Sequence, residues 1–364
     1  MQIQLKTKVL QALTNKVVKG LGNNKILPIT EMMGINIEGN KLALVSTDGT
    51  NKVEVFTTLE EELTDMHIAV PGSSFVKLIS KTTSENVIFL IEENRLTVKG
   101  NGVYTFSLPT DEDDNLITLL NITLPLPENG STQEIETHWL QDSYSVNKGS
   151  VASTLEVPAY TGFYYDSKYA ITTDSLKISS IQHHFSNNSM LLSASFVKLF
   201  TLLGGEKTIV MQTNSEIFLQ SGGVVLQGVK MPEVLSFPIS DIEPFLNINM
   251  SQCVRVNKQA LLNILERLAL FVSPFDENII RLDFTKQGLM LWNLKGTSNE
   301  LLPYIQVENL QDFSAKVSLV HLKSIISSNS GEELEIHFGI PEALKFTAGV
   351  VTQIVALHSE NETI

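Results

Sequence analysis

The sequence is poor in cysteine, lacks any long apolar run and carries fewer basic than acidic side chains. Its one cysteine, Cys253, cannot form a disulfide within the chain or a zinc cluster built from cysteine pairs, so we expect a reducing compartment. No segment reaches the roughly 18 uninterrupted apolar residues of a membrane span, and residues 1–13 lack the apolar stretch of a signal peptide. These absences predict a soluble, cytoplasmic protein.

Signatures of enzyme chemistry are also missing. No glycine precedes a lysine, which excludes the phosphate-binding loop, and there is neither a Gly-x-Ser-x-Gly turn nor a His-Glu-x-x-His pair. The adjacent His183 and His184 would point to opposite faces of a strand, so we expect no shared metal there. The acidic run 111–114 resembles a calcium loop, but Leu116 stands where that loop requires glycine. We predict no catalytic residue, no metal and no cofactor; an enzyme of unrecognised type is the alternative.

The charge balance restricts how the protein could bind nucleic acid. Forty acidic against 26 basic residues give a formal net charge of -14, which disfavours a protein that wraps nucleic acid with its whole surface. A local basic patch remains compatible with this balance. The length of 364 residues predicts more than one domain.

Internal repetition is the strongest positive signal in the sequence. Residues Ser74–Leu78 recur almost unchanged as Ser195–Leu199, and a fainter copy follows at residues 322–326. The opening strand and helix pattern of residues 3–13 returns at residues 254–264. These recurrences predict an α+β fold of three homologous domains, 1–125, 126–246 and 247–364.

Each domain follows one pattern: a strand, a helix, several strands, a second helix and several more strands. Alternating Val, Ile, Thr and Phe residues are typical of antiparallel sheet, against which two helices per domain would pack. The predicted helices are residues 7–20, 73–82, 137–152, 193–203, 257–271 and 318–328.

Positive charge is concentrated in these helices. Against two acidic residues, Asp142 and Glu266, they contain ten basic ones: Lys8, Lys16, Lys19, Lys77, Lys81, Lys148, Lys198, Lys258, Arg267 and Lys323. The helices thus carry a net +8 and the rest of the chain a net -22. Lysine is a good helix former and exposed helix faces are usually charged, but such faces normally mix both signs. We therefore predict a shared surface that faces an anion, with a phosphate backbone contacted without base reading.

The chain resembles the DNA polymerase sliding clamps of the bacterial beta-subunit type, with a phage or mobile-element version of them as an alternative. The resemblance is carried by residues 25–30, 42–49, 170–177, 237–238 and 354–357 in this order. It implies a head-to-tail homodimer in which three clamp-fold domains per chain form a ring around duplex DNA, with helices inside. It also implies a processivity factor in DNA replication, which holds the polymerase and the clamp loader through short peptide motifs. An acidic repeat scaffold that binds only proteins is the alternative.

The resemblance also implies two protein-binding sites. The family's peptide pocket lies between the second and third domains, and its counterparts here are Tyr160, Thr173, Ser175, Leu176, Lys177, Ile178, Pro238, Leu319, Ile354, Val355, Ala356 and Leu357. The family's Thr-Asp-Gly-His-Arg reads Thr-Asp-Ser-Leu-Lys at residues 173–177, and its Met-Pro-Met-Arg-Leu end is replaced, so a different peptide preference is expected. The dimer contact would use Phe106 and Leu108 of one chain and Phe271 and Val272 of the other. Burial within a single domain is the alternative for all these apolar residues.

Overall fold

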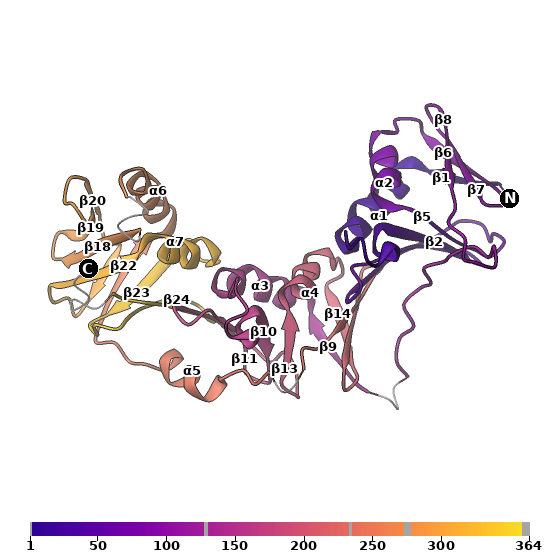
Figure 1. Cartoon of the computed structure of the whole chain (residues 1–364). Helices are drawn as coiled ribbons and strands as arrows, with labels where there is room; N and C mark the ends of the chain where they lie inside the picture. Colours follow the sequence, from indigo (N-terminus) through magenta and orange to yellow (C-terminus); the bar gives the residue numbers. More distant parts are fainter. Residues whose placement is uncertain (1, 127–129, 233–234, 273–277, 359–364) are drawn as a thin grey trace. The chain divides into compact units, whose positions relative to one another are not determined.

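The computed structural model describes residues 2–126, 130–232, 235–272 and 278–358, and the same order of elements occurs in it three times (Figure 1). Each occurrence, called a repeat below, runs strand, helix, four strands, helix, three strands, and the third has one additional strand before its second helix. The first repeat comprises β1 (Gln2–Lys6), α1 (Thr7–Val17), η1 (Val18–Gly20), η2 (Pro28–Glu31), β2 (Met32–Glu38), β3 (Lys41–Thr47), β4 (Lys52–Thr58), β5 (Met66–Pro71), α2 (Gly72–Lys81), β6 (Asn86–Glu92), β7 (Arg95–Lys99) and β8 (Val103–Ser107).

The second repeat has the same elements in the same order. It comprises β9 (Ser131–Glu136), α3 (Thr137–Asn147), η4 (Lys148–Ser150), η5 (Pro158–Thr161), β10 (Gly162–Tyr165), β11 (Tyr169–Thr173), β12 (Lys177–Gln182), β13 (Met190–Ser193), α4 (Ala194–Lys198), η6 (Leu199–Leu202), β14 (Lys207–Gln212), β15 (Glu216–Ser221) and β16 (Val224–Val229).

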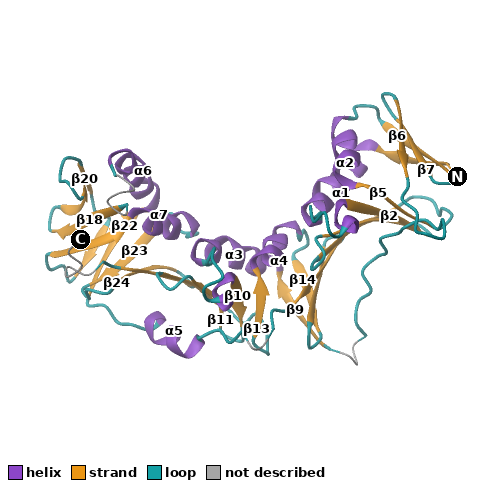
Figure 2. Cartoon of the chain, in the orientation of Figure 1, coloured by secondary structure: helices purple, strands orange, loops and turns teal. Residues whose placement is uncertain are grey.

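The third repeat follows a helix that the periodicity did not predict, α5 (Ile239–Leu246). It comprises β17 (Gln252–Asn257), α6 (Lys258–Leu268), η7 (Ala269–Phe271), β18 (Ile279–Thr285), β19 (Gly288–Asn293), β20 (Asn299–Leu302), β21 (Gln306–Glu308), β22 (Phe313–Ser318), α7 (Leu319–Ser328), β23 (Glu333–Phe338), β24 (Ala343–Ala348) and β25 (Val351–Ala356). Helices, strands and loops are distinguished in Figure 2.

Every repeat contributes two antiparallel sheets with four equivalent strands each, and in the third repeat β21 adds a fifth strand next to β17. The sheet that holds the first strand of a repeat, called its leading sheet, has the order β1-β6-β7-β8, β9-β14-β15-β16 or β17-β23-β24-β25. The other, called its trailing sheet, has the order β5-β2-β3-β4, β13-β10-β11-β12 or β22-β18-β19-β20. The α+β fold predicted from the sequence is confirmed.

Strand pairs between consecutive repeats merge these sheets into larger ones. Strand β4 pairs with β16, which joins the trailing sheet of the first repeat to the leading sheet of the second. Strand β12 pairs with β25, which joins the second repeat to the third in the same way. The chain divides into two compact units, Met1–His138 with Lys198–Lys230 and Trp139–Val197 with Met231–Ile364, each containing one merged sheet. The units cut across the second repeat, so the three domain boundaries stay a prediction.

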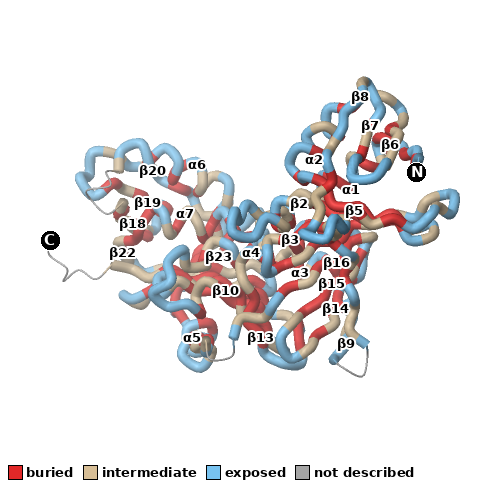
Figure 3. Tube along the Cα trace, turned by 45° about the vertical axis from the view of Figure 1, so that its right-hand side comes forward, coloured by how far each residue is buried: buried red, intermediate tan, exposed pale blue. Residues whose placement is uncertain are grey.

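The predicted helices form because apolar residues recur at helical spacing. In α1, the buried Leu10, Leu13 and Val17 lie on one face, while Lys8 and Asn15 occupy exposed positions. The side chain of Asn257 caps α6 by accepting the N–H of Ala260 at 2.8 Å. Buried residues line the inner strands and the helix faces turned toward them (Figure 3).

The unpredicted helix α5 contains Pro244, which removes a backbone donor and is the reason the sequence did not suggest a helix here. Its Ile242 and Leu246 are buried in a cluster with Phe237 and Ile354. In this unit α5 lies on one side of the merged sheet and α7 on the other (Figure 1). The second repeat is thus connected to the third by a segment that covers the sheet face opposite to α7.

The connection between the first and second repeats also covers a sheet face. A Cβ built on Gly34 would come within 2.3 Å of the carbonyl oxygen of Leu119, so only glycine allows this close approach. The side chain of Asn36 donates to the same carbonyl at 2.9 Å. Glu54, 1% exposed, accepts the N–H of Ile122 at 2.7 Å and pairs with the ammonium group of Lys41 at 2.6 Å. A buried carboxylate therefore fixes this connection on the sheet.

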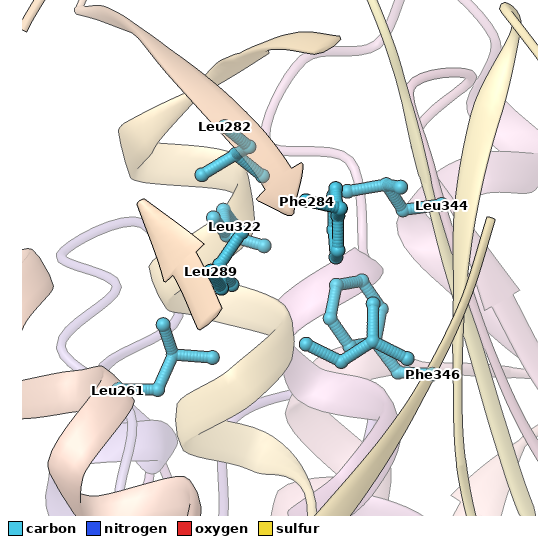
Figure 4. A pocket seen from close by; sticks show the side chains of 8 residues that line it. Leu261, Leu282, Phe284, Leu289, Leu322, Leu344 and Phe346 are labelled. Carbon is cyan, nitrogen blue, oxygen red and sulfur yellow. The ribbon is translucent and has the colours of Figure 1, made fainter. Parts of the chain in front are cut away.

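The third repeat encloses a small apolar cavity of about 10 Å³. Figure 4 shows the side chains around it, which come from both sheets and both helices of the repeat. They are Leu261, Leu282, Phe284, Leu289, Leu322, Ile336, Leu344 and Phe346. With no polar group in its lining, the cavity is expected to stay dry.

Candidate nucleic-acid and protein interfaces

The ten basic residues predicted to face DNA fall into two groups in the structure. Seven make no ion pair with any carboxylate of the described residues, and we call them the open lysines: Lys8, Lys16, Lys19, Lys77, Lys81, Lys148 and Lys198. All but Lys16, which is half-buried, are exposed. They belong to the helices of the first two repeats. No observation tests whether they contact DNA, so that role stays a prediction.

The placement of the open lysines costs some helix stability. Lys77 and Lys81 are four residues apart on α2, where two like charges repel each other by a few tenths of a kcal/mol. Lys8 lies in the first turn of α1, at the end of the helix where the backbone dipole disfavours a cation. A bound polyanion would relieve both.

The three basic residues on the helices of the third repeat already have acceptors within the chain. Arg267 donates two hydrogen bonds to Glu300, from Nε to Oε1 at 2.8 Å and from Nη2 to Oε2 at 2.5 Å. This bond lowers the pKa of the Glu300 carboxyl and raises that of Arg267. Lys323 pairs with Glu266 at 3.2 Å. Lys258 donates to the carbonyl of Asn329, and burial lowers the pKa of its ammonium group.

The Thr-Asp segments of the resemblance form the same turn twice. Thr47 accepts the N–H of Gly49 and donates to the carbonyl of Asn51, while Asp48 caps the turn. At residues 173–177 each of these bonds recurs at the corresponding position. Gly49 has φ of +97° and its counterpart Ser175 has φ of +77°, a left-handed conformation that a residue other than glycine adopts at a cost. The sequence repeat therefore extends to individual hydrogen bonds.

The twelve candidates for a peptide pocket lie in one unit but on two faces of its merged sheet. Tyr160, Ile178 and Ile354 belong to the apolar cluster around α5. Leu319 and Val355 belong to the core beneath α6 and α7, and Leu357 packs against that core. Successive residues of a strand point to opposite faces, so Ile354 and Val355 cannot line the same surface with their side chains.

The remaining candidates surround the end of β25. The exposed Leu176 accepts the N–H of Ala356 at 2.9 Å through its carbonyl, and Ser175, also exposed, precedes it in the turn. Lys177 is buried and pairs with Asp174 at 3.0 Å, and Thr173 is buried in the same turn. The half-buried Pro238 starts the segment of α5. A role of these residues in peptide binding remains a prediction.

The four candidates for a dimer contact differ in exposure. Leu108 is buried, and Phe106 is half-buried with its ring 5.8 Å from that of Phe75. Phe271, 60% exposed, and the half-buried Val272 follow α6. Interface roles for them stay predictions.

Sequence reasoning placed Phe106 and Leu108 on an edge-like strand but missed the second free edge, which is β20. In the described residues, β8 ends the leading sheet of the first repeat and β20 ends the trailing sheet of the third, and neither has a second neighbour. Val103 on β8 is 67% exposed, and Tyr104 and Leu301 on these two strands are also exposed.

Two further features of the described residues bear on function. They contain no group of three or more His, Cys, Asp or Glu side chains arranged to hold a metal ion. Among them, no helix is both long and apolar enough to span a membrane.

Comparison with known proteins agrees with this architecture. The family model described as DNA polymerase III beta subunit, N-terminal domain, matches residues 1–119. Among curated proteins, none matches this sequence.

Solved structures resemble the whole chain. The beta subunit of DNA polymerase from Streptococcus pyogenes has a TM-score of 0.83 at 17% identity, over 98% of this chain and 100% of that one. The DNA polymerase sliding clamp from Bacillus subtilis has a TM-score of 0.83 at 14% identity, over 99% of both chains. A sliding clamp from Pseudomonas aeruginosa bound to griselimycin has a TM-score of 0.82 at 15% identity, again over 99% of both. The first 119 residues therefore match the model of the N-terminal domain of the DNA polymerase III beta subunit, and over its whole length the chain has the fold of these sliding clamps.

Proposed function

We propose that the protein is a sliding clamp that encircles duplex DNA as a head-to-tail homodimer and tethers a replicative DNA polymerase. It would act without catalysis and without a cofactor, in the cytoplasm, as a processivity factor of DNA replication. The observation that carries this proposal is the repeated scheme by which one sheet edge joins another. The same scheme predicts that the two edges left without a partner, β8 and β20, pair between two copies of the chain.

The two strand pairs that join consecutive repeats use the same two kinds of sheet edge. The last strand of a trailing sheet, β4 or β12, pairs antiparallel with the last strand of a leading sheet, β16 or β25. One edge of each kind is left over: β20 ends a trailing sheet and β8 ends a leading sheet. Pairing of β20 with β8 of a second copy repeats the scheme, and two copies close into a ring of six repeats.

The backbone of β8 offers hydrogen bonds to such a partner. Leu108 donates its N–H to Asn94, and Gly100 donates to Gly102, so the even-numbered residues of β8 exchange hydrogen bonds with β7. In an antiparallel ladder the hydrogen-bonded pairs alternate, so the N–H of Thr105 points away from β7. The residues expected at the contact are these outward groups with Phe106, Leu108, Phe271 and Val272 around them.

The dimer is tested by removing one outward donor. Thr105→Pro deletes an N–H that β7 does not use and should shift the solution mass from about twice 40.3 kDa to 40.3 kDa at micromolar concentration. Thr105→Val, the matched control, keeps the N–H and should remain dimeric. A wild-type protein that is monomeric at this concentration would contradict the dimer.

DNA binding is supported by the segregation of charge. A net +8 on the helices and -22 elsewhere leaves the helices as the surface on which a phosphate backbone gains most. Enclosure makes a few salt-sensitive contacts sufficient, which leaves the protein free to slide.

Release from DNA tests this function directly. A clamp loaded on a closed circle should stay bound and should leave after the circle is cut, because it slides off the ends. Lys16→Glu, Lys81→Glu and Lys198→Glu together should shorten retention on the circle without unfolding the protein. A wild-type protein that leaves circular and linear DNA at the same rate is not a clamp, and binding to proteins alone would point to the acidic scaffold.

The second proposed surface holds the polymerase and the clamp loader through short peptides. It would be formed by the face around α5 and the end of β25, where Tyr160, Ile178 and Ile354 meet and Leu176 is exposed. Leu176→Asp should weaken the binding of the polymerase while retention on circular DNA is unchanged. Loss of both would indicate damage to the fold.

A further inference from the structure

The ion pairs of the third repeat distinguish its helices from those of the other two. The sequence assigns basic residues to the helices of all three repeats, but among the described residues only those of the third repeat each have a hydrogen-bond or ion-pair acceptor. Arg267 is held by both carboxylate oxygens of Glu300, and Lys323 is held by Glu266. Lys258 is bonded to a backbone carbonyl.

A cationic side chain that already has an acceptor within the chain gains less free energy when it binds a phosphate. The two-pronged guanidinium–carboxylate geometry is the same geometry in which arginine would hold a phosphate, so Arg267 must give up Glu300 before it can bind one. Lys323 must likewise release a partly exposed carboxylate. The carboxylates themselves also repel the phosphate backbone. The open lysines bear none of these costs.

From this contrast, and resting on the proposed function, we propose that the phosphate contacts are made by the open lysines of the first two repeats and that the helices of the third repeat contribute almost none. Around the duplex in the ring, the strongly attractive helices of the first two repeats would then alternate with the weakly attractive helices of the third. The duplex would then be held against the first two repeats of each chain, with the third repeat serving closure and partner binding.

The salt dependence of binding counts the contacts. The observed affinity falls with salt by a slope of about 0.9 for every phosphate neutralised on duplex DNA. The full-length dimer is mixed with a short labelled duplex, and its affinity is measured by fluorescence anisotropy between roughly 50 and 200 mM salt. Circular dichroism and solution mass confirm that each variant is folded and dimeric.

Two matched double variants compare the repeats. Lys8→Gln with Lys77→Gln removes two open lysines from each chain, four from the dimer, and should reduce the slope by about 3.6. Lys258→Gln with Lys323→Gln removes the same charge from the third repeat and should change the slope by less than about 0.5. Equal reductions in the two variants would overturn the proposal.

A third variant should act in the opposite direction. Glu300→Gln removes the carboxylate that holds Arg267 in each chain, so the two freed guanidinium groups of the dimer should steepen the slope by up to about 1.8 and tighten binding at low salt. An unchanged slope would mean either that Arg267 cannot reach a phosphate even without Glu300, or that it already binds one in the wild type. Both results would contradict the proposal that Glu300 competes with phosphate for Arg267. Failure of the wild type to persist on circular DNA would instead reject the clamp itself.

Discussion

Glu54 offers a quantitative test of how the first connection is held to its sheet. Its carboxylate is almost completely buried, and each oxygen has one partner. One oxygen accepts the N–H of Ile122 at 2.7 Å, and the other is 2.6 Å from the ammonium group of Lys41. Glu54→Ala removes both bonds and leaves the N–H of Ile122 without an acceptor.

The cost follows from what each partner can do afterwards. A buried N–H without an acceptor costs about 1–3 kcal/mol. Lys41 is partly exposed and can be hydrated again, so its loss adds less than the 3–5 kcal/mol typical of breaking a fully buried pair. We expect Glu54→Ala to lower the local free energy of unfolding by about 3 kcal/mol. Glu54→Gln keeps an acceptor for Ile122 and should cost about 1 kcal/mol.

Native-state hydrogen exchange measures this locally. A loss of about 3 kcal/mol corresponds to roughly 100-fold faster exchange in a peptide covering residues 116–124. Glu38→Gln is the matched control on the same connection, because Glu38 accepts from Asn121 at 3.0 Å at the exposed surface and should change exchange less than about threefold. Exchange in Glu54→Ala within about threefold of the wild type would refute the assigned role.

Three other measurements follow from the structure. Both Ser175 and Gly49 have positive φ, a conformation that costs serine more free energy than glycine. In urea unfolding, Ser175→Gly should therefore raise the stability of its unit by about 1 kcal/mol, and Gly49→Ser should lower the stability of the other unit by a similar amount. A stability change of the opposite sign in either variant would contradict the strain. Burial raises the pKa of the Cys253 thiol to about 11 from an ordinary 9, which leaves less thiolate at pH 8 in the folded protein than in urea. Alkylation should therefore be about tenfold slower in the folded protein, after allowance for the higher nucleophilicity of a more basic thiolate, and an equal rate would show the burial to be wrong. Leu282→Ala should enlarge the apolar cavity and destabilise the third repeat by about 3 kcal/mol. Binding of xenon would confirm the enlarged cavity. A loss of stability under about 1 kcal/mol would mean that the surrounding side chains collapse into the space.

Local periodicity was sufficient to place the two helices of each repeat, although not α5. The predicted helix 7–20 is α1 continued by η1, and the predicted helix 257–271 begins one residue before α6 and ends with η7. A helix buries one face every 3.6 residues whatever it packs against, so its pattern is written in neighbouring residues. The internal repeat was also visible in neighbouring residues. The recurrence of 74–78 at 195–199 predicted it, and the equivalent helices α2 and α4 confirm it.

The candidate site was predictable only in part. The sequence supplied the charge segregation and, through the family resemblance, candidates for a peptide pocket, which stay a prediction. It did not indicate that Arg267 meets Glu300, 33 residues away on another element, or that Ile354 and Val355 serve different cores. Nor did it reveal α5, whose proline argues against a helix and whose formation depends on the apolar cluster that it covers.

The sequence by itself determined the order of elements, their repetition and the sign of charge on each helix, because these depend on residues close together in the chain. Only the tertiary structure decided which cations are free, which strand edges lack a neighbour and which face each connection covers. Those properties depend on contacts between residues distant in sequence, and neither composition nor periodicity records such pairs.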